Sequence, residues 1–71
     1  MKATLEFDLP EDSGAHLRAV HADNLAFVLW DLDQWFRDEI KYQDNHDMQP
    51  ARDKLHEILD DRGIILDTLI E

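Results

Sequence analysis

Apolar residues between positions 23 and 42 follow the spacing of an amphipathic helix with an unusually wide apolar surface. Those that recur at i, i+3, i+4 and i+7 predict one broad stripe, made of Leu25, Val28, Leu29, Leu32, Trp35, Phe36 and Ile40. Phe27 and Trp30 fall on the opposite side of this helix, three residues apart and therefore adjacent. Because the core stripe and the aromatic pair cannot both face one small core, we expect the chain to associate with a partner.

Apolar and polar residues alternate strictly at the start of the chain. This period of two predicts a β-strand with one buried face, formed by Ala3, Leu5, Phe7 and Leu9. A single strand cannot satisfy its own backbone hydrogen bonds, so it needs a partner strand. That partner is either the tail of the chain or the same strand of a second copy, paired about a two-fold axis. We favour the second copy.

Two further helices are expected, one on each side of the long helix. The first begins at Asp12 or Ser13 and ends near His21. The second begins at Asp47, and Gly63 is placed to end it in a left-handed conformation. The tail after this glycine is either a short strand or a last helical turn. The predicted fold class is therefore mainly α with one N-terminal β-strand, in the order β-α-α-α.

The length of the chain favours a homodimer. Residues 1–71 form a single domain, in a size range where one core contributes only a few kcal/mol. The chain has no cysteine, so neither disulfides nor a thiolate zinc site can add stability. Oligomerisation or very good helix packing is what remains.

The charge of the chain restricts its partners. Seventeen acidic against seven basic residues give a net charge of −10. Such a chain is repelled by phosphate backbones and anionic lipids, so we expect it to bind neither nucleic acid nor membrane directly. Its partners should be basic. The start of the chain has no long apolar run, so we expect no signal peptide or membrane span and a cytoplasmic location.

No residue pattern predicts catalysis, a cofactor or a metal site. Ser13 is the only serine and lies at an expected helix cap, so a nucleophile is lacking. His16 and His21 are five residues apart, about 140° around a helix, and cannot share a metal as i, i+4 histidines do. Asp33 lies near the edge of the stripe, where we expect it to pair with Arg37 at i+4. The prediction is that this protein is not an enzyme.

The exposed side of the long helix is the candidate partner-binding surface. We assign it Phe27, Trp30, Asp31 and Asp38, because aromatics outside the core often anchor interfaces and carboxylates attract basic partners. The acidic character has two interpretations. It either keeps a small apolar-rich protein soluble or allows it to occupy a basic nucleic-acid groove of another protein.

A resemblance to a family of short proteins encoded by tailed phages and prophages rests on three segments: LEFDLPED, VLWDLDQWFRDEIKY and RDKLHEILDDRGIILDTLIE. They match a pattern of LEF-x-LPE, LWDLDQW-x-R and R-x-KL-x-EIL followed by Gly-Ile, over nearly the whole chain, with LWDLDQW its most specific part. The resemblance implies a viral origin and no enzymatic activity. Small acidic phage proteins of this kind often bind and block a host protein, such as a CRISPR effector or another antiviral system.

The leading hypothesis is therefore a phage anti-defence protein, a homodimeric inhibitor that binds a host defence protein stoichiometrically. Two alternatives stay open. One is an antitoxin-like or accessory adaptor that binds a partner from its own operon. The other is a structural module whose dimerisation is its whole role.

Overall fold

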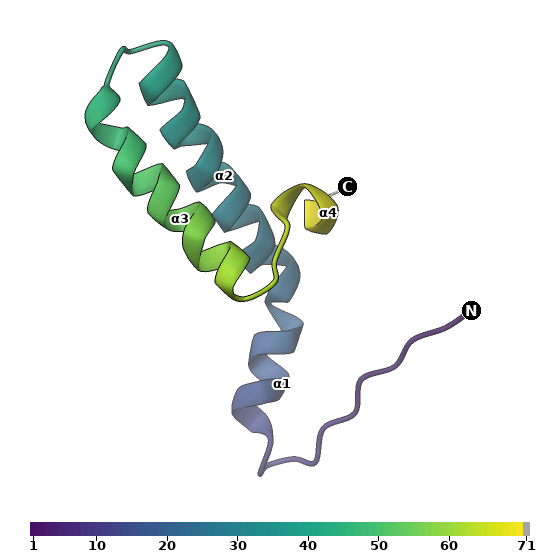
Figure 1. Ribbon diagram of the computed structural model, residues 1–71. Helices are drawn as coiled ribbons and strands as arrows, with labels where there is room; N and C mark the ends of the chain where they lie inside the picture. Colours follow the sequence, from purple (N-terminus) through teal and green to yellow (C-terminus); the bar gives the residue numbers. More distant parts are fainter. Residues whose placement is uncertain (71) are drawn as a thin grey trace.

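The computed structural model describes residues 1–70, and all regular secondary structure in this range is helical. The elements are α1 (Ser13–Val20), α2 (Ala22–Lys41), the short 3-10 helix η1 (His46–Met48), α3 (Gln49–Asp61) and α4 (Leu66–Ile70). Helices α2 and α3 form an antiparallel hairpin, and α4 folds back to pack on α2 (Figure 1). Helix α1 continues past the end of this hairpin with a bend.

The predicted N-terminal β-strand is wrong, and with it the β-α-α-α fold class. Residues 1–8 carry no regular secondary structure, and no strand exists within residues 1–70 that could pair with them. Ala3, Leu5 and Leu9 are exposed, and only Phe7 is half-buried, with its ring 5.4 Å from that of His16. The alternating pattern therefore places one aromatic side chain on α1. It does not build a sheet, because a ladder needs a second strand.

A turn connects this extended segment to α1. The Asp12 N–H donates to the Asp8 carbonyl over 2.8 Å, and the Asp8 N–H donates to the Asp12 carboxylate over 3.0 Å. Asp12 thus occupies the N-cap position of α1, but its side chain stabilises the preceding turn rather than the first turn of the helix. Because the turn reverses the chain, Leu5, Phe7 and Leu9 lie opposite α1, while the chain before them diverges from this helix toward the N-terminus (Figure 1).

The end of α3 determines where the tail goes. Gly63 has φ +71°, as its predicted left-handed role requires, and the prediction is confirmed. The Ile64 N–H donates to the Leu59 carbonyl over 2.9 Å, and the Gly63 N–H donates to the Asp60 carbonyl over 3.0 Å. This pair of bonds is the Schellman motif, which satisfies the last carbonyls of a helix. The reversal directs the tail onto α2, where it forms helix α4 and not a strand.

The core lies between α2, α3 and α4 and is small. Leu59, Leu66 and Asp33 are the residues of the described range that are less than a tenth exposed. Leu29, Phe36 and Ile40 of α2 are half-buried on the same face as Asp33.

The other half of the predicted stripe lies outside the core. Its residues are exposed by 52%, 60%, 40% and 49% for Leu25, Val28, Leu32 and Trp35, respectively. We name these four residues the outer stripe. Helices α3 and α4 approach α2 on the side of Asp33. The face of α2 that is buried is therefore rotated around the helix relative to the predicted stripe.

Candidate functional site

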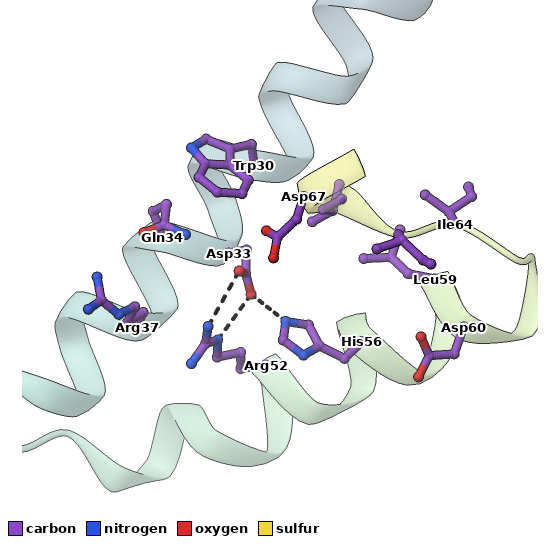
Figure 2. Close-up of a pocket in the computed structure, with 12 residues that line it drawn as sticks. Trp30, Asp33, Gln34, Arg37, Arg52, His56, Leu59, Asp60, Ile64 and Asp67 are labelled. Carbon is purple, nitrogen blue, oxygen red and sulfur yellow. Dashed lines mark hydrogen bonds and ion pairs between the residues drawn. The ribbon is translucent and has the colours of Figure 1, made fainter. Parts of the chain in front are cut away.

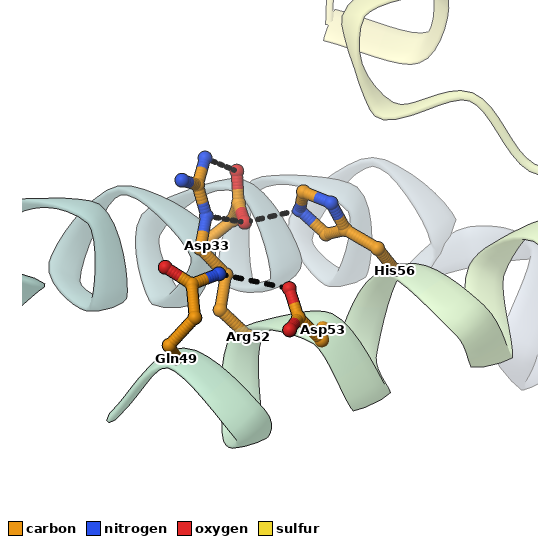
Figure 3. A network of polar contacts seen from close by, with 5 residues as sticks. All are labelled: Asp33, Gln49, Arg52, Asp53 and His56. Atoms are coloured by element: carbon orange, nitrogen blue, oxygen red, sulfur yellow. Dashed lines mark hydrogen bonds and ion pairs between the residues drawn. The ribbon is translucent and has the colours of Figure 1, made fainter. Parts of the chain in front are cut away.

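A buried carboxylate joins the two arms of the hairpin. Asp33, only 6% exposed in the middle of α2, faces Arg52 and His56, which lie one turn apart on α3 (Figure 3). Arg52 Nε donates to Asp33 Oδ1 over 3.0 Å, and Arg52 Nη2 is 3.4 Å from Asp33 Oδ2. His56 Nε2 is 2.6 Å from Asp33 Oδ1. An ionised carboxylate only accepts hydrogen bonds, so Nε2 is the protonated ring nitrogen.

The network keeps Asp33 ionised. Burial alone raises the pKa of this carboxyl, but the hydrogen bonds from Arg52 and His56 and their charges outweigh burial and hold its pKa below the ordinary 3.8. The hydrogen bond to Asp33 raises the pKa of Arg52 further, with a smaller contribution from the charge of Asp53. Both carboxylate oxygens are engaged and the group stays charged at neutral pH. A permanently ionised carboxylate of this kind is suited to linking α2 to α3 and not to transferring a proton.

The predicted pair between Asp33 and Arg37 is wrong. Asp33 points across the hairpin to α3, and in residues 1–70 no ion pair engages Arg37. The sequence did carry a signal for this arrangement. Apolar residues at −4, +3 and +7 surround Asp33 and place it on the middle of a buried face. Arg52 and His56, four residues apart on one helix, could have been recognised as its partners.

An open groove of about 470 Å³ lies over this network, between α2, α3 and α4 (Figure 2). Trp30 of α2 forms one wall, and Leu59 and Ile64 contribute an aliphatic lining. Two carboxylates complete the groove, from Asp60 of α3 and Asp67 of α4, and Figure 2 shows Asp67 pointing toward its middle. No ion pair or side-chain hydrogen bond to either carboxylate is present in the described part of the chain. The lining also carries basic side chains, from Arg37 of α2 and from Arg52 and His56 of the network. The side formed by Asp60 and Asp67 is therefore the part of the groove that suits a cationic group with an apolar stem.

The residues predicted to bind a partner occupy different places on α2. Trp30 is half-buried and lines the groove. Phe27 is 45% exposed and does not line it. Asp31 and Asp38, two helical turns apart, are exposed and also lie outside the groove lining. The structure thus brings one of the four residues into a concave site.

Sequence reasoning missed the groove itself and its carboxylate from α4. Asp67 follows Gly63 by only four residues, in a tail whose structure the apolar pattern left undecided between strand and helix. Its position depends on the chain reversal at Gly63 and on the packing of α4 against α2. A local pattern contains no information about either contact.

Three further findings concern metal sites, membrane-spanning helices and similarity to known proteins. Within the range that the structure describes, no three His, Asp or Glu side chains lie close enough together to hold a metal ion. None of the helices in residues 1–70 combines the length and the apolar character that crossing a bilayer requires. Comparison of the chain with protein-family models, curated proteins and solved structures found no match.

Proposed function

We propose that this protein is a non-catalytic inhibitor that binds a host antiviral defence protein stoichiometrically in the cytoplasm of an infected cell. The observation that carries the proposal is the groove beside α2, with its aromatic wall at Trp30 and its carboxylates at Asp60 and Asp67. A lysine or arginine of the partner suits the part of the groove formed by these carboxylates, away from Arg37 (Figure 2). Its stem would lie along the aliphatic lining and its charged end would face the carboxylates and the indole ring.

The charge of the whole chain supports a basic target surface. A net charge of −10 attracts basic surfaces over several ångströms and speeds their association. Asp31 and Asp38 extend the acidic surface along α2 beyond the groove, and both are exposed. The basic surface of a nucleic-acid-binding defence enzyme fits this pattern, and the resemblance to short phage proteins supports a target in the host. Blocking such a surface inhibits the enzyme without any chemistry by the inhibitor.

The proposal includes a homodimer. In the described part of the chain, only three residues are less than a tenth exposed to solvent. This is a small core for an independent domain. A homodimer also presents two copies of the groove, and two linked sites bind a repetitive or symmetric target more tightly than one.

A capture experiment from host lysate tests the inhibitor function. Wild-type protein on beads is compared with the double variant Asp60→Asn/Asp67→Asn, which removes the charges of these two carboxylates but keeps the size of each side chain. Glu6→Gln/Asp8→Asn is the matched control, because it removes two acidic charges from the segment before α1. We expect a basic defence protein to be retained by wild type and by the control and lost with the groove variant. Inhibition is then measured as restored phage plaquing in cells that carry the defence system.

Other outcomes would contradict the proposal. Retention of a protein encoded next to this chain would identify an antitoxin or adaptor. Retention of a virion protein would identify an assembly role. Equal loss of the target with the groove variant and the control would assign binding to net charge alone and remove the groove from the proposal.

A further inference from the structure

The outer stripe repeats every three and four residues along α2. Leu25, Val28, Leu32 and Trp35 are separated by three, four and three positions, which is the a/d spacing of a coiled coil. Each of the four side chains is between 40% and 60% exposed. They follow the side of α2 that faces neither α3 nor α4. A continuous apolar seam of this kind on one helix is suited to packing against a second helix with the same spacing.

The surface of the chain is larger than its mass explains. A compact monomer of 8.4 kDa exposes about 4,600 Å², whereas this chain exposes 6,058 Å². Its radius of gyration is 15.9 Å, against about 11 Å for a compact chain of this length. Part of this excess of about 1,400 Å² lies on the extended residues 1–8, outside the outer stripe, and part lies on exposed apolar side chains of the helices. An interface of standard size removes about 800 Å² from each copy, a little over half of the excess.

We propose that the outer stripe is the seam of a homodimer in which the α2 helices of two copies pack antiparallel about a two-fold axis. An axis midway along the stripe, at the height of position 30 but on the side of α2 opposite the Trp30 ring, aligns all four residues of each copy. Trp35 then meets the partner's Leu25, and Val28 meets the partner's Leu32. The two-fold axis repeats each contact, so the Trp35 ring of each copy packs against the smaller Leu25 side chain of the other copy. This proposal rests on the homodimer of the proposed function but not on target binding, and it assigns dimerisation to α2 and not to the N-terminal segment.

The charges beside the seam give it a particular response to salt. In this arrangement Asp31 lies on the flank of the seam near the axis, and each copy carries a net charge of −10. Like charges oppose association, and salt screens them over about 10 Å at moderate ionic strength. Rising salt therefore strengthens the dimer. Rising salt also weakens binding to a basic target. The opposite salt dependences therefore distinguish a failure of the dimer seam from a failure of target binding.

Sedimentation equilibrium of the purified chain tests the seam. We expect wild type to be dimeric at micromolar concentration and Leu32→Glu and Val28→Glu to be monomeric with an unchanged helical circular dichroism spectrum. Leu5→Glu is the control, because Leu5 is 78% exposed on the N-terminal segment and outside the seam. A wild type that is monomeric throughout this range overturns the proposal. So does a folded Leu32→Glu variant that dimerises like wild type.

Crosslinking tests the orientation of the helices, and the natural absence of cysteine makes each engineered thiol unique. Under mild oxidation we expect a mixture of Leu25→Cys and Trp35→Cys chains to form a disulfide-linked dimer faster than either variant alone, because an antiparallel seam brings position 25 against the partner's position 35. A parallel seam brings the two copies of each position together instead. Faster crosslinking of either variant alone would overturn the antiparallel arrangement.

Discussion

At the scale of single residues, Asp33 links the two helices of the hairpin. Burying a charge is costly unless it is paired and hydrogen-bonded, and here one carboxylate receives donors from both Arg52 and His56. Only one register of α3 along α2 brings both donors within reach. A hairpin held by half-buried aliphatic contacts alone could slide by a turn. The network thus contributes specificity to a core that contains few fully buried side chains.

Replacement of Asp33 should lower the free energy of unfolding by more than replacement of an exposed aspartate does. We expect Asp33→Ala to lower the free energy of unfolding by about 1–3 kcal/mol, because two donors lose their acceptor in a partly buried site. Asp53→Ala is the control, since Asp53 accepts only an exposed hydrogen bond from Gln49 on its own helix. Its effect should stay within about 0.5 kcal/mol. Urea denaturation of the three proteins measures both values, and equal effects would remove the special role of Asp33.

The lowered pKa of Asp33 also predicts a pH dependence. A carboxyl whose pKa is lower in the folded than in the unfolded chain binds fewer protons when folded, so its contribution to stability is complete above the unfolded value near 3.8. This contribution is lost as the pH falls through the folded pKa. We expect the difference in stability between wild type and Asp33→Asn to be largest near neutral pH and to shrink below about pH 4. A difference that grows on acidification would contradict the assigned ionisation state.

At the scale of the elements, the local patterns predicted the three longer helices but not their packing. The helical spacing before Gly63 was sufficient to locate α2 and α3, and the glycine itself marked the end of α3. The alternation at residues 1–8 had the same apparent clarity, yet it lacks the second strand that would make it a sheet. Likewise, the wide stripe of α2 did not indicate which side the tail would cover. Both errors concern contacts between distant segments, which no local pattern contains.

The two glycines of the chain should respond oppositely to the same substitution. Gly63 has a left-handed φ of +71°, and a Cβ added there would meet no atom within 4 Å. Gly63→Ala should therefore be destabilising through the backbone alone, by about 1–2 kcal/mol. Gly14 lies inside α1, where an added Cβ would meet only Arg18 Nη1 at 3.6 Å. Gly14→Ala should increase helix stability by up to about 1 kcal/mol. Thermal unfolding followed by circular dichroism measures both, and effects of the same sign would contradict the backbone argument.

At the scale of the whole molecule, folding and association should be coupled. The core beneath α4 contains Leu59 and Leu66 as its buried apolar residues within the described range, while the outer stripe is exposed in the single copy. Leu59→Ala should therefore destabilise the chain by about 2–4 kcal/mol at every protein concentration, because it leaves a cavity inside each copy. A variant that unfolds like wild type would show that α3 and α4 contribute little to the core.

Dimerisation through the outer stripe predicts a different dependence on concentration. A tenfold increase in wild-type concentration favours the dimer by about 1.4 kcal/mol, which should raise the melting temperature by about 3–6 °C for a unit of this size. Leu32→Glu should melt at a temperature that does not change with concentration, because its seam cannot form. Leu59→Ala should melt lower but keep the concentration dependence, since its seam is intact. Scanning calorimetry at several concentrations separates the two behaviours. If wild type also melts independently of concentration, its α2 seam does not contribute to stability, and the protein folds as a monomer whose outer stripe serves some other contact.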